Sequence, residues 1–142
     1  MIKTPAVPRV RRVLETAIDC DDLARTSAFY RALFDAPPIL DTDRLVVFDA
    51  GEGTLLLLFQ RGNTNALAMP GGVIPAHDAG GPGHFAFAID AASLAAWEAR
   101  LGALGIAIES RVTWERGGTS LYFRDPDGRS VELATPGLWP TY

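Results

Sequence analysis

The hydrophobic and polar positions of the first half of the chain predict a strand, a helix and three more strands. Residues 13–20 are mostly β-branched or apolar, and Asp22 then offers an N-cap for a helix whose apolar side chains recur at helical spacing. Pro37 and Pro38 end this helix, because proline is not tolerated in a helix interior. Short apolar runs bounded by polar residues and glycine predict strands at 39–41, 45–50 and 54–60.

The second half repeats this order of elements after a connector rich in glycine, proline and asparagine. Residues 84–90 predict a strand, and a helix then begins at Ser93 and ends before Gly105. Three strands follow again, at about 106–115, 119–124 and 130–135. We therefore predict an α+β fold of two tandem βαβββ modules that form a curled mixed sheet. We expect a single domain over 1–142, with module 1 at about 12–60, a connector at 61–82 and module 2 at about 83–136.

Composition narrows the class of protein. The chain has 142 residues, 48% of them hydrophobic, which is enough to bury the core of one domain. Cys20 is the single cysteine and cannot form an internal disulfide, and no secretory signal is recognisable, so we expect a cytoplasmic location. The longest apolar run, 55–59, is far too short to cross a membrane. The net charge is −4, and the basic cluster of Arg9, Arg11 and Arg12 is confined to the N-terminus, which argues against a nucleic-acid partner.

Strand alternation places three candidate metal ligands on one side of the predicted sheet. His84 begins a strand whose phenylalanines point the other way, and Glu132 and Glu15 hold comparable positions in two other strands. Two carboxylates and one imidazole, completed by water, suit Mn²⁺, Fe²⁺, Zn²⁺ or Mg²⁺ better than copper. The residues alone leave two other interpretations open: His84 can be a hydrogen-bonding strand residue, and Glu132 can lie on a solvated sheet face.

Other residues are candidates for substrate contact or proton transfer. Tyr122 and Arg124 share the cavity-facing side of their strand, where they can orient an anionic or phenolic substrate or make structural bonds at the sheet edge. Trp114 and Leu57 are candidate apolar walls of the same cavity. His77 on the connector is a weak candidate for a general acid or base, and an exposed loop histidine is the alternative.

Three segments resemble the glyoxalase, bleomycin-resistance and dioxygenase superfamily, also called vicinal oxygen chelate (VOC) proteins. Residues 22–30, DLARTSAFY, are similar to the family's first-helix motif, and 83–87, GHFAF, to the opening of its second module. Residues 120–133, SLYFRDPDGRSVEL, resemble its closing hairpin, the most specific of the three motifs. The resemblance spans about 13–140 and implies the VOC fold, a homodimer and a small-molecule substrate.

The resemblance also implies roles for single positions. His84 and Glu132 fall on the family's metal-ligand positions with its usual residue types, whereas Glu15 stands where most relatives have histidine. Leu57 stands where glyoxalase I-like relatives carry a fourth, glutamate ligand. This departure makes a glyoxalase I reaction less favoured and leaves a three-ligand pattern nearer to the extradiol dioxygenases and thiol transferases.

Two functions follow as hypotheses. The first is an enzyme with one divalent metal ion, of the lyase or isomerase, thiol transferase or dioxygenase type, acting on a small substrate with adjacent oxygen atoms. The alternative is a metal-free protein that binds a drug or another small molecule, as bleomycin-resistance proteins do. The fold alone does not select among the three reaction types of the enzyme.

Overall fold

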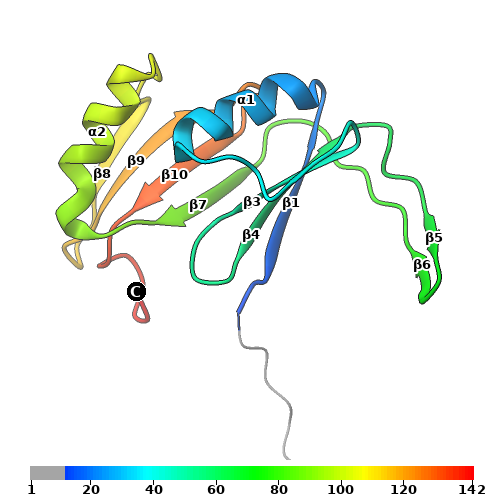
Figure 1. The fold of residues 1–142 in the computed structure, drawn as a ribbon. Coiled ribbons are helices and arrows are strands. Elements are labelled where there is room, and N and C mark those ends of the chain that lie inside the picture. Colours follow the sequence, from blue (N-terminus) through cyan, green and yellow to red (C-terminus); the bar gives the residue numbers. More distant parts are fainter. Residues whose placement is uncertain (1–11) are drawn as a thin grey trace, which may run out of the picture.

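A computed structural model describes residues 12–142, so Arg9 and Arg11 of the basic cluster lie outside the described residues. Module 1 forms one four-stranded sheet in the order β1-β4-β3-β2, in which β1 is parallel to β4 and the other neighbours are antiparallel (Figure 1). Its elements are β1 (Glu15–Cys20), α1 (Leu23–Phe34), β2 (Leu40–Asp41), β3 (Leu45–Asp49) and β4 (Leu55–Gln60).

Module 2 forms a second four-stranded sheet with the same arrangement, β7-β10-β9-β8. Its elements are β7 (His84–Ala88), the 3₁₀ turn η1 (Ala91–Ser93), α2 (Leu94–Ala103), β8 (Ser110–Thr113), β9 (Thr119–Arg124) and β10 (Ser130–Ala134). The two registers match, because Ala17 pairs with Leu57 in module 1 as Ala86 pairs with Glu132 in module 2. The fold class is therefore confirmed, and Leu57 is the positional counterpart of Glu132.

Local sequence signals explain the ends of the main helix. The Asp22 carboxylate accepts a hydrogen bond from the backbone N–H of Arg25, as an N-cap does. The helix ends at Phe34, because Asp35 adopts a left-handed conformation with φ 52° and its backbone N–H bonds back to the last turn. Pro37 and Pro38 then keep the chain from continuing as a helix.

The connector differs from the prediction. It contains a two-stranded hairpin, β5 (Leu67–Met69) and β6 (Gly72–Ile74), which extends away from both sheets (Figure 1). The described residues thus form ten strands rather than the eight expected from the modules. The hairpin was missed because its strands have only three residues each, and its turn consists of the proline and glycine that indicated a loop. The strand predicted at 106–115 is likewise shorter, at four residues.

One continuous hydrophobic core joins the two modules. The helix α1 packs on β3 and β4 of its own module, and Phe29 and Tyr30 on its other side contact Phe123 and Phe85 of module 2. Tyr30 and Phe123 are fully buried. Among residues 12–142, no helix combines the length and the hydrophobicity required for a membrane span.

A buried set of charged side chains also ties the modules together. Arg129, in the turn between β9 and β10, pairs with Asp125 at 3.2 Å and Asp127 at 3.0 Å and donates to the carbonyl oxygen of Asp19. Asp125 also accepts a hydrogen bond from the Tyr30 hydroxyl at 2.9 Å, and Asp127 accepts one from Thr26 on α1. We call Asp125, Asp127, Arg129, Tyr30 and Thr26 the inter-module network. Because its charges are paired and hydrogen-bonded to one another, it fixes the β9–β10 hairpin against module 1.

Candidate functional site

The sheet of module 2 turns its larger apolar side chains to the core and a set of polar side chains to the opposite face. We call the polar set His84, Ser120, Tyr122 and Glu132 the cup face, since these positions alternate with core residues along β7, β9 and β10. His84, Tyr122 and Glu132 line a cavity of about 520 Å³. The other residues that line it are alanines, aromatic residues and one leucine: Ala86, Phe87, Ala88, Trp114, Ala134, Leu138, Trp139 and Tyr142.

The contact between His84 and Glu132 is the central feature of this cavity. His84 Nδ1 lies 2.9 Å from the backbone carbonyl oxygen of Ser130, and a carbonyl only accepts, so Nδ1 carries the proton. In the neutral imidazole, Nε2 then presents a lone pair. This Nε2 lies 3.3 Å from Glu132 Oε1, which is also an acceptor. Two lone pairs therefore face each other, and a cation or a proton between them would relieve the repulsion.

Glu132 is buried, with 5% of its surface exposed. Its second oxygen, Oε2, accepts a hydrogen bond of 2.6 Å from the Ser120 hydroxyl. The Ser120 oxygen in turn accepts a bond of 2.8 Å from the indole N–H of Trp114. Such a carboxylate is costly to bury unless its charge is compensated. The structure thus holds one carboxylate oxygen by donors and leaves the other directed at His84.

Tyr122 stands beside this pair. Its ring stacks on the His84 ring with centroids 6.1 Å apart. Burial, and after it the negative charge of Glu132, raise the pKa of the Tyr122 hydroxyl, so the phenol keeps its proton at neutral pH. It can therefore donate a hydrogen bond to a ligand oxygen in the cavity.

Arg124 lies on the same strand, but its guanidinium is already engaged. Its Nε and Nη2 donate to Glu109 at 2.6 and 3.0 Å, and Nη1 donates to the Gly128 carbonyl. The hydrogen bond from Arg124 lowers the pKa of Glu109. Arg124 is not among the residues that line the cavity of the cup face. Its predicted contact with substrate stays a prediction.

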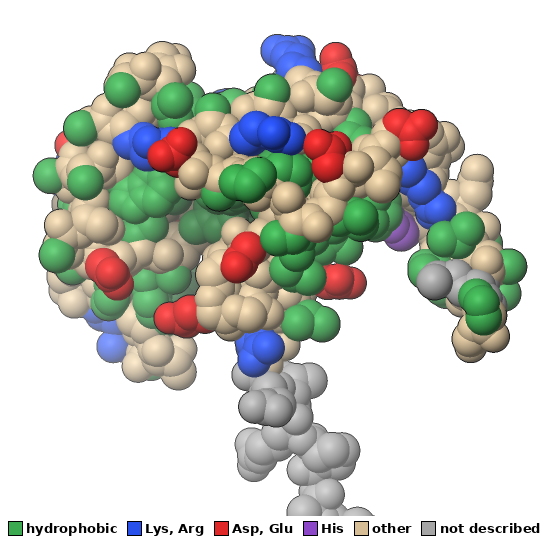
Figure 2. Space-filling model, viewed as in Figure 1, with side chains coloured by type: hydrophobic (Ala, Val, Ile, Leu, Met, Phe, Trp, Pro, Cys, Tyr) green, Lys and Arg blue, Asp and Glu red, His purple; other side chains and the backbone are tan. Residues whose placement is uncertain are grey.

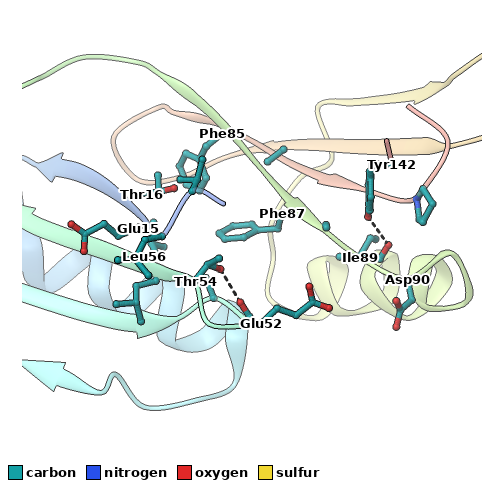
Figure 3. A pocket seen from close by; sticks show the side chains of 18 residues that line it. Glu15, Thr16, Glu52, Thr54, Leu56, Phe85, Phe87, Ile89, Asp90 and Tyr142 are labelled. Carbon is teal, nitrogen blue, oxygen red and sulfur yellow. Dashed lines mark hydrogen bonds between the residues drawn. The ribbon is translucent and has the colours of Figure 1, made fainter. Parts of the chain in front are cut away.

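Glu15 and Leu57 lie on module 1, away from the cup face. Glu15 is exposed at the start of β1 and lines a cleft of about 450 Å³ between the modules. Its carboxylate points away from Phe85 and Phe87 on the opposite wall (Figure 3). Figure 2 shows a hollow between the modules with hydrophobic side chains on its walls. Within residues 12–142, no three His, Cys, Asp or Glu side chains come close enough together to hold a metal ion. One chain therefore brings His84 and Glu132 together but does not add Glu15.

His77 has a partner that the sequence did not reveal. Its Nδ1 lies 3.6 Å from Oδ1 of Asp19, and its ring packs edge-on against Phe59 at 4.5 Å. Asp19 is 95% buried, and its Oδ2 accepts a bond from the backbone N–H of Ala79. Its Oδ1 has no hydrogen-bond partner among the described residues. The sequence signal for this contact is the acidic Asp19 between the apolar residues Ile18 and Cys20 of a predicted strand, together with His77 on the connector.

Comparisons with known proteins found similar sequences and similar folds. A family model described as "Glyoxalase/Bleomycin resistance protein/Dioxygenase superfamily" matches residues 12–133. The chain is 30% identical over 119 residues to the metallothiol transferase FosB of Bacillus licheniformis, with 83% of this chain and 71% of that protein covered. The crystal structure of a lactoylglutathione lyase from Agrobacterium tumefaciens is 37% identical with a TM-score of 0.83, and the match covers 94% of this chain and 99% of the other. A glyoxalase/bleomycin resistance protein from Catenulispora acidiphila, at 21% identity and a TM-score of 0.64 over 87% and 96% of the chains, shares the fold.

Proposed function

The chain belongs to the glyoxalase/bleomycin resistance protein/dioxygenase superfamily, and from this we propose that it is a divalent-metal-dependent enzyme whose site is built on His84 and Glu132. The observation that carries the proposal is the 3.3 Å distance between Nε2 of His84 and Oε1 of the buried Glu132 carboxylate. A nitrogen and a carboxylate oxygen are the donors that Zn²⁺, Mn²⁺ and Fe²⁺ take from proteins. A bound cation would polarise a substrate oxygen and stabilise the negative charge that develops there.

We propose that a second copy of the chain supplies the third ligand. Glu15 holds the same register in module 1 as His84 does in module 2, since Glu15 pairs with Leu55 as His84 pairs with Ser130. In a two-fold dimer, module 1 of one copy facing module 2 of the other would add the partner subunit's Glu15 to each cup face. The β5–β6 hairpin supports such a dimer, because it extends from its own chain with Leu67, Val73 and Ile74 exposed.

Thiol transfer is the reaction type we favour. Leu57, 9% exposed and paired with Ala17, occupies the position of a fourth ligand and cannot coordinate a metal, which leaves a three-ligand site. The names of two relatives, a metallothiol transferase and a lactoylglutathione lyase, refer to a thiol and to a thioester of glutathione. Trp114 and Trp139 would exclude water from a small substrate with adjacent oxygens, while the Tyr122 phenol donates to one of these oxygens.

His77 is the candidate general acid or base of this enzyme. The buried Asp19 carboxylate lies near its Nδ1 and can orient the ring, which leaves Nε2 for proton transfer. His77 packs against Phe59 on module 1, the module that carries Glu15. In the proposed dimer, His77 and the third ligand of a cup face would come from the same subunit.

Titration of Mn²⁺ into chelator-treated protein tests this function. We expect wild type to bind about one ion per chain, and His84→Ala and Glu132→Gln to lose at least about 100-fold in affinity. Glu15→Gln protein and Glu132→Gln protein should be mixed and allowed to exchange subunits. In the heterodimer both mutations then fall in the same site, so the second site is intact and should bind Mn²⁺. Wild type that binds no more tightly than His84→Ala would overturn the proposal, and mixtures without restored binding would show that Glu15 does not act across the dimer.

A metal-free binding protein is the second candidate. Its supporting observation is the number of apolar and aromatic walls around the cavity, together with the ability of a protonated His84 to pair with Glu132 without a metal. Metal analysis of protein purified without chelator separates the two candidates. Stoichiometric metal supports the enzyme, and a metal-free protein that binds a hydrophobic anion in the cavity supports the alternative.

A further inference from the structure

Two residues next to the ligand pair of the cup face, Trp114 and Ser120, form a chain of hydrogen bonds that ends at Glu132. Ser120 is fully buried on β9, opposite Ala134 of the neighbouring strand. Trp114 follows β8 and is partly exposed, with its indole N–H turned toward Ser120.

The chemistry of the three groups fixes the direction of the hydrogen bonds. The indole N–H of Trp114 can only donate, so the Ser120 oxygen must accept from it at 2.8 Å. A serine hydroxyl has a single proton, and the remaining contact of 2.6 Å is to Oε2 of Glu132. The proton therefore points from Ser120 to the carboxylate, in a short bond of the charge-assisted kind. Trp114 thus orients the Ser120 hydroxyl so that its proton points at the Glu132 carboxylate.

We propose that Ser120, held by Trp114, positions Glu132 as a one-oxygen metal ligand, an inference that rests on the metal site proposed above. Oε2 is occupied by the hydroxyl, so only Oε1 faces His84 and the cavity. Without Ser120 the carboxylate could rotate about its last torsion, which is broad for glutamate, and Oε1 would no longer be held opposite His84 Nε2. We call Trp114 and Ser120 the positioning relay.

The backbone around Trp114 keeps the relay in place. The turn after β8 is closed by bonds from Trp114 N–H to the Gly118 carbonyl and from Gly117 N–H to the Trp114 carbonyl. Gly118 in turn lies against the C-terminal segment, where an added Cβ would come within 2.8 Å of backbone atoms of Pro136 and Gly137. The C-terminal segment that supplies Trp139 to the cavity wall therefore also supports the relay.

Calorimetric titration of Mn²⁺ into the chelator-treated full chain tests the relay. Ser120→Ala should weaken Mn²⁺ binding by about 10- to 100-fold, as loss of a group that orients a metal ligand does. Trp114→Phe keeps the ring but not the N–H, and should weaken binding by about 3- to 10-fold. Ser110→Ala is the matched control, since Ser110 pairs with Tyr122 on the same sheet face and is exposed. It should leave the affinity unchanged.

A double mutant distinguishes a relay from two structural roles. If Trp114 acts through Ser120, the Trp114→Phe/Ser120→Ala protein binds Mn²⁺ as Ser120→Ala alone does, whereas independent residues give additive losses. Unfolding curves of the metal-free variants show whether a loss of affinity merely follows a loss of folding. If wild type binds Mn²⁺ but Ser120→Ala binds it equally tightly, or if the losses in the double mutant are additive, the relay is overturned and the proposed metal site is not. Wild type that does not bind Mn²⁺ overturns both.

Discussion

The β9–β10 hairpin supplies charged side chains to two regions, and these side chains differ in how completely they are paired. In the inter-module network, Arg129 pairs with one oxygen of Asp125 and one of Asp127, and these two oxygens also accept from Tyr30 and Thr26. The other oxygen of each carboxylate accepts from backbone N–H groups. On the cup face, Glu132 receives one hydrogen bond and directs its other oxygen at a lone pair. The network pairs its charges within the chain, whereas on the cup face our proposal assigns a bound metal ion as the partner of the second Glu132 oxygen.

The two regions also differ in what surrounds them. Asp125 and Arg129 are at most 5% exposed and lie between the modules, so their ion pair is shielded from solvent. His84 is half exposed, although its partner Glu132 is buried. A substitution in the network should therefore lower the free energy of unfolding, and a substitution on the cup face should instead change binding.

Arg129→Met should give the largest effect on stability. It leaves the buried Asp125 carboxylate without its cation, so the free energy of unfolding should fall by about 3 to 5 kcal/mol. Denaturant unfolding monitored by fluorescence measures this change. Arg124→Met is the matched control from the same hairpin: both side chains of the Arg124–Glu109 pair are about half exposed, and its loss should leave stability nearly unchanged. Equal losses in the two variants would contradict the distinction between a buried network and a surface pair.

The second prediction concerns the pH dependence of the network region. Burial, partly offset by the charge of Arg129, raises the pKa of Cys20 from 9.0 to about 11. A raised pKa in the folded state means that the folded protein holds the thiol proton more tightly than the unfolded protein does. The stabilisation is thus complete below pH 9 and is lost as the pH rises toward 11, with a total of about 2 to 3 kcal/mol. Cys20→Ala should not show this part of the decline, and parallel pH curves for both proteins would refute it.

The smallest change in the free energy of unfolding is expected for a substitution on the cup face. Whether this change is positive or negative distinguishes the two interpretations of the His84–Glu132 pair. Glu132→Gln replaces an acceptor facing His84 Nε2 with an amide that can donate to it, while the amide oxygen still accepts from Ser120. The free energy of unfolding of the metal-free protein should rise by up to about 1 kcal/mol. A clear loss of stability in urea unfolding would mean that the His84–Glu132 pair is a structural ion pair like those of the network.

The sequence predicted the cup face better than the network, for a physical reason. Side chains alternate along a strand, so a period of two was enough to place His84, Tyr122 and Glu132 on one face. The network joins Arg129 and Asp125 to residues about a hundred positions away in the chain, and no local pattern carries such a contact. Ser120 shares the periodicity of Tyr122, but its bond to Glu132 depends on how β9 pairs with β10.

The fold was predictable where elements are long and bounded by clear signals. The Asp22 cap and the paired prolines located α1 correctly, and the repeated order of elements gave the two sheets. The β5–β6 hairpin was not predictable from its glycine and proline content. The position of Glu15 could not be predicted in full. Strand alternation predicts which face of its sheet Glu15 lies on, but the arrangement of the two modules decides what this face packs against. Within one chain, Glu15 does not reach His84.

The most direct test of the central claim is the protonation of the His84 ring in the metal-free protein. Long-range nitrogen–proton NMR spectra of labelled histidine distinguish the two ring nitrogens, and the chain has only two histidines, so His77→Ala assigns the signals. At about pH 8 we predict a proton on His84 Nδ1, a bare Nε2, and a shift of the Nε2 resonance when Zn²⁺ is added, with the His77 signals unchanged. A His84 ring that carries a proton on Nε2 and does not respond to Zn²⁺ would contradict the account.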